Sequence, residues 1–319
     1  MLKYLFRRII SVIPVILIVT FLIFSIMHSI PGGPASSILG LEATPEEVAR
    51  LNAQLGLDQP FLKQYLDWLF KAFKGDLGES YFMGGPVKDI LVDYIRATVS
   101  LALVAGLISA IVGMTFAIIS IFYRNTVIDK LIVTINLIGQ GVPSFVISLI
   151  NLIIFAVMLK VLPVSGYRPL SMGWSEHLKY LILPAMSISI GQAAYIARMS
   201  RAAMIRILDQ PFILSATLKG VSKWHLFYHH ILRNSLVPII TAIGQSLGSL
   251  LAGSIIVETI FGIPGLGQLL INSISRRDYA VIQAVILVIS VTYILINLLV
   301  DISYALIDPR IRYEGSDQS

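Results

Sequence analysis

The chain has 319 residues, of which 56% are hydrophobic and only 13% are charged, and it contains no cysteine. An ordinary soluble domain carries about 25% charged residues, so this composition indicates a protein of the lipid bilayer. The absence of cysteine excludes disulfides, thiol catalysis and cysteine-ligated metals. The net charge of +6 does not indicate a nucleic-acid partner, because the basic residues lie between apolar runs and not on one soluble face.

The first apolar run, residues 9–30, follows the basic sequence MLKYLFRR and therefore begins like a signal peptide. The run is longer than the ~7–15 residues of a signal-peptide core, and at ~1.5 Å per residue it can span a ~30 Å hydrocarbon layer. We therefore expect segment 1–30 to be an uncleaved anchor span. Lys3, Arg7 and Arg8 place its N-terminus in the cytoplasm by the positive-inside rule.

Segment 31–96 has more acidic than basic residues, as expected of an external segment. A capping box begins a helix at Thr44, with proline at the first helical position and Glu47 at the third. Farther along, aromatic and apolar residues recur at helical spacing, at Phe61, Tyr65, Trp68 and Leu69. These patterns predict two or three amphipathic helices over the outer mouth. Their aromatic side chains lie either at the lipid headgroups or against the helix bundle.

Five further apolar runs predict membrane spans, at 97–122, 128–160, 178–197, 234–257 and 281–300. The sequence Gly139-Gln-Gly-Val-Pro143 interrupts the second of these runs. Segment 198–233 carries six Lys or Arg residues and one acid, so it should be cytoplasmic. Residues near Tyr123 are also predicted to be cytoplasmic, so an even number of crossings must lie between them and that segment. Residues 128–160 are therefore predicted to make one bent or partly unwound crossing.

This reasoning predicts an all-α membrane protein with six transmembrane helices and both termini in the cytoplasm. Its transmembrane core would occupy 97–307 and its cytoplasmic tail 308–319. The interiors of the six runs contain no Asp, Glu, Lys or Arg; charged residues, Glu258 and Asp301 among them, stand only at or just beyond the run ends. An ion-coupled carrier usually needs such a group or broken helices that hold the ion, and the chain has no Gly-x-x-x-x-Gly-Lys-Ser/Thr loop for ATP. The energy for transport is therefore expected to come from another subunit.

Two alternatives from other classes remain open at this point. An ion-coupled secondary transporter would move its solute without ATP. An intramembrane hydrolase would need a catalytic pair inside the spans, but their interiors contain no Asp, and a serine alone lacks an evident base. We predict a non-catalytic transport protein with no catalytic residues and no metal site.

Small residues recur at helix-packing spacing within the spans, as in Gly244-x-x-x-Gly248 and Gly106-x-x-x-Ala110. Such pairs let helix backbones approach closely, either within one bundle or between two subunits. Scattered amides and hydroxyls are candidates for the lining of a polar translocation pathway, at Asn136, Gln140, Ser144, Gln192 and Gln245. The alternative is that they only form hydrogen bonds between helices.

Segment 211–232 interrupts the apolar pattern with a basic, histidine-rich sequence. Proline begins a short helix over 212–219, Gly220 fits a left-handed position that ends it, and Ser222 can cap a second helix. One face of the second helix carries Trp224, Phe227, Tyr228 and Ile231. The segment is thus predicted to be a cytoplasmic helix–turn–helix whose small residues dock into a groove of another protein.

Three other interpretations of this segment are weaker. His225 and His229 have the spacing of a helical metal pair, but neither a third ligand nor a cysteine accompanies them. A basic amphipathic helix could instead lie on anionic lipid. Nucleic-acid binding fits poorly, because membrane spans tether the segment at both ends.

The segment resembles the cytoplasmic coupling loop of ABC-importer permeases. A small residue at 216 precedes Gly220, and after nine intervening residues comes His230-Ile-Leu-Arg-Asn-Ser-Leu-Val-Pro238, as in the dipeptide/oligopeptide branch of that family. The similarity extends in order along the chain through Pro31-Gly-Gly-Pro34, Gly56-Leu-Asp-Gln-Pro60, Gly75-Asp-Leu-Gly78, Pro143-Ser-Phe145, Val257-Glu-Thr-Ile-Phe-Gly-Ile-Pro-Gly-Leu-Gly-Gln268, Arg277-Asp-Tyr279 and Asp308-Pro-Arg-Ile-Arg312. The chain is most similar to the first permease subunit of oligopeptide importers. It departs from the family at Leu214-Ser215-Ala216, where the general loop has Glu-Ala-Ala, and it has one cation fewer before Gly220 than the peptide branch usually has.

The resemblance implies a bacterial cell-membrane permease that imports oligopeptides. Its implied partners are a second, related permease, two cytoplasmic ATPases that bind ATP and Mg, and an external peptide-binding protein. This chain itself would hold no cofactor. The residues implied to couple it to the ATPases are Ser215, Ala216, Lys219, Gly220, Trp224, Phe227 and His230. Dipeptides, nickel chelates or glutathione are the alternative solutes for the same architecture.

Overall fold

The computed structural model describes residues 2–29, 33–40, 43–80 and 82–307. The described chain is mostly helical and contains no strand, which confirms the all-α class. Its one β-type contact is an isolated bridge between Glu79 and Pro86. The predicted cytoplasmic tail 308–319 lies outside the described residues.

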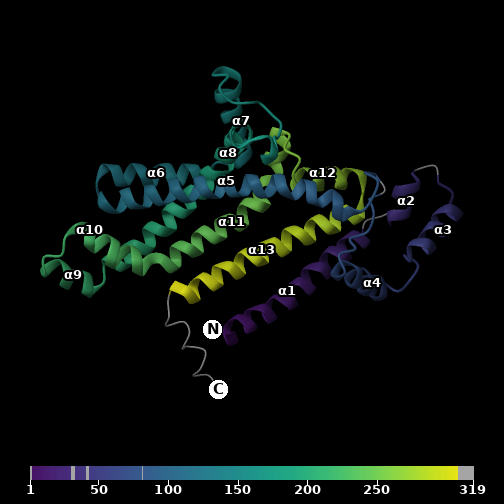
Figure 1. Ribbon diagram of the computed structural model, residues 1–319, viewed down its shortest axis with the longest axis horizontal. Coiled ribbons are helices and arrows are strands. Elements are labelled where there is room, and N and C mark those ends of the chain that lie inside the picture. Colours follow the sequence, from purple (N-terminus) through teal and green to yellow (C-terminus); the bar gives the residue numbers. More distant parts are fainter. Residues whose placement is uncertain (1, 30–32, 41–42, 81, 308–319) are drawn as a thin grey trace.

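Long helices lie side by side along the long axis of the molecule (Figure 1). Five of them are long and apolar enough to cross a membrane: α1 (Leu2–His28), α5 (Val87–Phe122), α8 (Trp174–Leu208), α11 (Arg233–Phe261) and α13 (Tyr279–Ile307). Helix α11 packs against α5, α8 and α13, and α1 packs against α13. Apolar side chains turned outward on α1, α5 and α13 are expected to contact lipid.

A bent pair of helices corresponds to the predicted broken run. Helix α6 (Val127–Gly141) ends where the sequence placed the interruption, and α7 (Ser144–Asn151) continues into the π-helical segment η1 (Leu152–Met158). The two halves meet at an angle of 101°. In Figure 1 the second half projects from the side of the bundle. The span count is five, or six if this pair forms one crossing.

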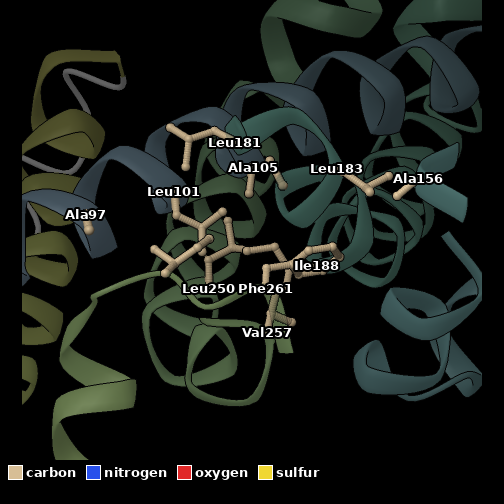
Figure 2. Close-up of a cluster of buried hydrophobic side chains, with 12 residues drawn as sticks. Ala97, Leu101, Ala105, Ala156, Leu181, Leu183, Ile188, Leu250, Val257 and Phe261 are labelled. Carbon is tan, nitrogen blue, oxygen red and sulfur yellow. The ribbon is translucent and has the colours of Figure 1, made fainter. Parts of the chain in front are cut away.

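Tight helix packing builds the core (Figure 2). The buried cluster combines side chains from α5, α8 and α11, among them Leu101, Leu181, Leu250 and Phe261. Glycines permit the close approaches: a Cβ on Gly244 would lie 2.0 Å from Val300 of α13. The Gly244-x-x-x-Gly248 motif therefore packs against another helix of the same chain, as in the first of the two alternatives, packing within one bundle.

Short helices α2 (Gly33–Leu39), α3 (Pro45–Leu55) and α4 (Phe61–Phe73) gather at one end of the molecule (Figure 1). The predicted capping box is present, because the Glu47 amide donates to the Thr44 hydroxyl and the Thr44 amide donates to the Glu47 carboxylate. Tyr65 is buried against α1, 5.6 Å from the ring of Phe24. The inner aromatics of α4 thus cover the bundle. Phe70 and Phe73 are exposed on the same helix.

The opposite end of the molecule carries α9 (Pro211–Leu218), α10 (Lys223–His225) and the π-helical segment η3 (Leu226–Leu232) (Figure 1). The remaining short elements are the 3-10 turn η2 (Leu170–Met172) and helix α12 (Leu266–Arg276). Helix α12 packs against α11 and α13. The two small helical groups therefore lie at opposite ends of the long helices, as expected of segments on opposite sides of a membrane.

Candidate functional site

A polar cavity of about 400 Å³ lies among the long helices. It is lined by residues of α6, α8, α11 and α13: Gln140, Gly191, Gln192, Tyr195, Gln245, Ser249 and Tyr293. We call it the central cavity. Three of the five residues proposed from the sequence to line a pathway, Gln140, Gln192 and Gln245, meet here. The other two do not, since Asn136 is buried elsewhere on α6 and Ser144 begins α7.

Glycines shape the walls of the central cavity. A Cβ on Gly248 would lie 2.6 Å from the Tyr293 ring, so the absence of a side chain lets that ring lie against α11. Gly191 similarly faces the backbone oxygen of Gly139, where α6 and α8 cross closely. The Tyr195 hydroxyl donates a hydrogen bond to the Gln245 side-chain oxygen, which joins α8 to α11 across the cavity.

The lining of the central cavity is polar but carries no charged group. Side-chain amides and hydroxyls both donate and accept hydrogen bonds, so they can replace the hydration of a polar solute without selecting one charge. Tyr195 and Ser249, which the sequence reasoning missed, lie three and four residues after the predicted Gln192 and Gln245. Helical spacing was the signal that could have found them. Tyr293 had no such signal, because it comes from a helix without a predicted member.

Helix–turn–helix geometry is present in segment 211–232, as the sequence predicted. Gly220 has a φ of +77° and ends α9, and the Val221 amide donates to the Ala216 carbonyl across the turn. The Ser222 hydroxyl accepts from the His225 amide at the start of α10. Two residues separate the end of α8 at Leu208 from the start of α9, and η3 runs directly into α11.

Apolar side chains anchor this helix–turn–helix to the bundle. Phe227, Ile231 and Ile213 are buried in a cluster with residues of α5 and α8. The Phe122 ring at the end of α5 lies 4.9 Å from the rings of both Phe227 and Trp224. These contacts fix the position of the segment relative to the long helices.

The predicted aromatic face is divided in the structure into a buried edge and an exposed edge. Phe227 is 1% exposed, whereas Trp224 is 62% exposed and stacks on exposed Tyr228. One edge of the face is used to attach the segment to α5, and only the other edge remains accessible. The accessible residues of the predicted coupling set are Ser215, Lys219, Gly220 and Trp224, with Ala216 and His230 half-buried.

Exposed apolar side chains extend this surface onto α9. Leu214 is 64% exposed and Leu218 is 79% exposed, and no described residue covers them. Together with Trp224 and Tyr228 they form what we call the coupling surface. The His225 and His229 rings stack 4.1 Å apart nearby, and no group of three possible metal-ligating residues occurs in the described chain.

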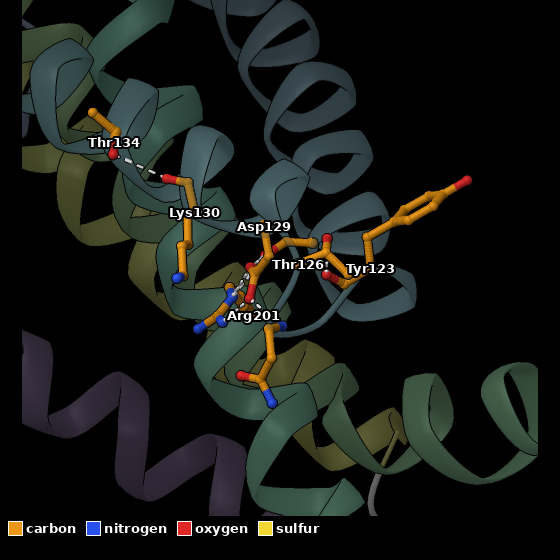
Figure 3. Close-up of polar contacts among 8 residues, drawn as sticks. Tyr123, Thr126, Asp129, Lys130, Thr134 and Arg201 are labelled. Atoms are coloured by element: carbon orange, nitrogen blue, oxygen red, sulfur yellow. Dashed lines mark hydrogen bonds and ion pairs between the residues drawn. The ribbon is translucent and has the colours of Figure 1, made fainter.

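A buried ion pair ties α6 to α8 (Figure 3). Asp129 accepts from Arg201 Nη2 at 2.8 Å and Arg201 Nε at 3.0 Å, and also from the Asn125 amide and the Ser120 hydroxyl. An exposed pair, Arg124 with Asp209 at 3.1 Å, joins the α5–α6 turn to the residue after α8. Sequence reasoning missed the buried pair, because its members are 72 residues apart.

A second buried carboxylate, Glu258, lies near the other end of α11. The sequence placed this residue at the end of an apolar run, but α11 continues to Phe261 and Glu258 is fully buried. Its oxygens accept from the Thr98 and Ser254 hydroxyls, at 2.7 and 3.0 Å, and from the amides of Gly267 and Gln268, at 2.8 and 3.2 Å. Glu258 therefore ties α11 to α5 and to the start of α12.

Residues 102–313 match the family model of the binding-protein-dependent transport system inner membrane component, and residues 1–102 match the model of its N-terminal region. A probable peptide ABC transporter permease of Sinorhizobium fredii is 38% identical, over 97% of this chain and 99% of that protein. A glutathione transport system permease protein of Escherichia coli K12 is 38% identical, over 98% of this chain and 100% of that protein.

The fold is also similar to a solved transporter. A chain of the inward-facing MetNI methionine ABC transporter superposes with a TM-score of 0.58, covering 69% of this chain and 96% of that one, at 17% identity. The identity is low, so this likeness concerns the fold alone. The full-length relatives and the two family matches settle the assignment, which agrees with the predicted resemblance. The chain belongs to the family of binding-protein-dependent transport system inner membrane components, as a multi-pass permease subunit of an ABC importer.

Proposed function

We propose that this chain is one of two permease subunits of an ATP-driven oligopeptide importer, in which it forms half of the translocation pathway. Two ATPases on the side of the coupling surface bind ATP and Mg and perform the hydrolysis, while this chain performs no reaction. An external binding protein delivers the peptide on the side of α2, α3 and α4. Both termini lie on the ATPase side.

The coupling surface is the observation that carries this proposal. Leu214, Leu218, Trp224 and Tyr228 are exposed outside the long helices, while Phe227 beneath them is buried and holds the segment in place. An apolar surface on a rigid support is suited to binding a groove in another protein. Its position at one end of the spans fits a cytoplasmic ATPase.

The connections of the coupling surface suggest how force reaches the pathway. Segment 211–232, which carries this surface, is connected at its start to α8 and at its end to α11. These two helices carry Gln192 and Gln245 of the central cavity. The Tyr195–Gln245 hydrogen bond joins the same two helices at the cavity. Movement of an ATPase against the segment would therefore tilt both walls of the cavity, opening it to one side of the membrane and then the other.

Peptides are the solute that the central cavity suits best. A peptide backbone presents the same amide groups in every sequence, and uncharged amide side chains can pair with them irrespective of the peptide's side chains. The similar Sinorhizobium fredii permease is named for peptides, and the Escherichia coli one is named for glutathione, itself a small peptide. Dipeptides, nickel chelates and glutathione are the competing solutes.

A substitution at Gly220 tests the docking assignment. Gly220→Trp places a large ring in the turn between the two helices that carry the coupling surface, and we expect it to abolish ATP-stimulated uptake and ATPase binding while the protein stays in the membrane. Gly84→Trp is a matched control: Gly84 also has a positive φ, +72° against +77°, also has open space around its Cβ position, and lies on the outer side. The backbone strain is then similar, about 1–2 kcal/mol at each position, and only the location differs. Normal uptake by Gly220→Trp would contradict the assignment.

A length series tests the solute. Uptake of peptides of two to six residues, of glutathione and of a nickel chelate should be compared in the importer reconstituted with its partners. The proposal expects longer peptides to compete best. Transport by this chain alone under an ion gradient, without ATPases, would favour the secondary-transporter alternative instead.

A further inference from the structure

A second cavity, of about 660 Å³, lies at the outer end of the molecule. It is bordered by the end of α1, by α2, α3 and α4, and by the first turns of α13. We call it the outer cavity. Its volume lies within the ~300–1,000 Å³ that is typical of small-molecule sites. It is separate from the central cavity, with which it shares no lining residue.

Two buried polar side chains in the wall of the outer cavity lack hydrogen-bond partners. Tyr279 is 8% exposed and Gln283 is 7% exposed, and they lie one helical turn apart on α13. The Tyr279 hydroxyl is fully buried and has no hydrogen-bond partner in the described chain. The Gln283 amide also bonds to no described residue, but its polar atoms are not fully buried. The preceding residue, Asp278, by contrast accepts from the Ser80 hydroxyl. Buried polar groups are nearly always hydrogen-bonded, so the unpaired Tyr279 hydroxyl in a cavity wall, with the Gln283 amide one turn away, indicates a site for a polar ligand.

Charged side chains of both signs line the same cavity on its exposed side without forming ion pairs. Asp67 and Lys71 lie on successive turns of α4, and Asp76 follows that helix. No ion pair within 4.0 Å joins these three among the described residues, and Asp76 accepts only the Gly78 amide. An unpaired ammonium beside unpaired carboxylates complements a ligand that itself carries both charges.

Aromatic rings supply an apolar wall. The ring centroids of Phe24 and Trp68 lie 5.8 Å apart, and Phe24 also stacks on His28 at 4.1 Å. His28 is held in turn by Gln64, which donates to two backbone carbonyls of the loop before α4. The wall is thus built before any ligand arrives, as expected of a binding site.

We propose that the outer cavity binds a short peptide in its zwitterionic form, before the peptide enters the central cavity. The peptide's ammonium group lies against Asp67 or Asp76, its carboxylate against Lys71, and its backbone amides against Tyr279 and Gln283. A side chain of the peptide packs on Trp68. This inference rests on the proposed function for the identity of the solute, and it adds a reception site on the outer side.

The absence of cysteine permits a direct test by single-cysteine labelling. Gln54→Cys places a thiol in the wall of the outer cavity, and Ala49→Cys places one on the same helix outside the cavity. The intact importer in nanodiscs is treated with a thiol reagent in the presence of trialanine. At ten times its dissociation constant, trialanine should slow labelling at position 54 about tenfold, with no change at position 49.

Variants of the chain then test each proposed contact. Tyr279→Phe and Gln283→Leu should each raise the trialanine concentration needed for protection by about 2- to 10-fold. Thermal unfolding should stay unchanged in Tyr279→Phe, since its hydroxyl has no partner to lose. Lys71→Met should remove the preference for trialanine over trialanine with an amidated C-terminus. Asp67→Asn, alone or combined with Asp76→Asn, should remove the preference for trialanine over its N-acetyl form.

Three results would overturn the proposal: no protection by trialanine, equal protection by peptides with both ends blocked, or protection by the peptide-free binding protein alone. Uptake of trialanine is measured on the same nanodisc preparation transferred to liposomes. Uptake without protection refutes the outer site but leaves peptide import standing. Loss of both refutes the proposed function as well.

Discussion

Helix α11 carries two polar regions that differ in how their hydrogen bonds are satisfied. At Glu258 four donors surround one carboxylate, and the Thr98 hydroxyl that serves it also accepts the Leu266 amide. At the central cavity, to which α11 contributes Gln245 and Ser249, Gln245 accepts from the Tyr195 hydroxyl. The side chains of Gln140 on α6 and Gln192 on α8 bond to no described residue. Polar groups that are fully bonded hold helices together, whereas groups left unbonded can exchange hydrogen bonds with a solute.

Glycines reinforce the contrast between the two regions. A Cβ on Gly265 would lie 2.3 Å from the Glu258 carboxyl carbon, and one on Gly267 would lie 2.4 Å from the Ile255 Cα. The chain therefore closes directly around the carboxylate and excludes water. At the central cavity, glycines instead make room for a ring and for a helix crossing. The first region is built for stability and the second leaves space open.

Removing the Glu258 carboxylate should have the largest effect. Glu258→Ala leaves the Thr98 hydroxyl and two backbone amides buried without an acceptor, so we expect the free energy of unfolding to fall by about 3–5 kcal/mol. Chemical unfolding in detergent micelles measures the change. Glu176→Ala is the control. Its carboxylate is exposed and forms one long ion pair, 3.9 Å from Lys179, so its removal should lower the free energy of unfolding by about 0.5 kcal/mol or less. Equal losses in the two variants would remove the distinction.

The two Asp–Arg pairs at the other end repeat the contrast at a smaller scale. Asp129→Ala leaves the partly buried Arg201 guanidinium without its carboxylate and with only the Ser120 hydroxyl to accept from it, and we expect a loss of about 2–3 kcal/mol. Asp209→Ala breaks the exposed pair with Arg124 and should cost at most about 1 kcal/mol. The same unfolding measurement applies, with added salt as a second probe. Salt should weaken only the exposed pair, so a strong salt effect on Asp129 would contradict its assigned burial.

A cavity glutamine should reverse the pattern, with an effect on transport but little on stability. Gln192→Leu removes an amide that supports no described contact, so the unfolding free energy should change by less than about 0.5 kcal/mol. The initial rate of peptide uptake per inserted protein should fall about 2- to 10-fold, as one hydrogen bond to the solute is lost. Thr115→Leu, which replaces a polar side chain by leucine at an exposed position of α5 outside the cavity, should leave uptake unchanged. Unaltered uptake in Gln192→Leu would remove that residue from the pathway.

The smallest effect is expected at the capping box of α3. Hydrogen bonds from the Thr44 backbone and then from its side chain hold the pKa of Glu47 below its usual range. The folded state therefore binds this proton less readily than the unfolded state. The contribution is fully present above the ordinary pKa of Glu and is lost as the pH falls through the lower folded value.

Hydrogen exchange at the Glu47 amide measures this local effect. After correction for the intrinsic pH dependence, protection should decline from pH 6 to pH 3.5 in the unmodified chain. Glu47→Gln should lose most of that decline, whereas Glu46→Gln, which leaves both Thr44 bonds in place, should retain it. Identical pH profiles in all three chains would show that the carboxylate contributes nothing to the cap.

Local features of the sequence proved good guides to the fold. The break before Pro143, the capping box at Thr44 and the helix end at Gly220 occur where residue chemistry predicted them. Each depends on a few neighbouring residues and on backbone geometry that proline and glycine restrict or permit. The central cavity was found in part, because its glutamines are conspicuous in apolar helices.

Contacts between distant residues were missed or misjudged. The aromatic face of the coupling segment was predicted from spacing alone, but burial of Phe227 depends on Phe122 of another helix. Asp129 and Arg201 look like ordinary cytoplasmic charges until α6 and α8 bring them together. Periodicity gives the direction of a side chain around its own helix and leaves its neighbour undetermined.

The sequence by itself determined that this is a helical membrane protein, where its helices end and bend, and to which family it belongs. The helices and their ends are local properties, because in lipid each helix must satisfy its backbone hydrogen bonds within itself. The tertiary structure alone decided which polar groups are bonded and which remain open, since Thr98 meets Glu258 across 160 residues. Lipid is as apolar as the helix surfaces, so packing of small residues and buried hydrogen bonds, not hydrophobic pattern, selects the helix partners.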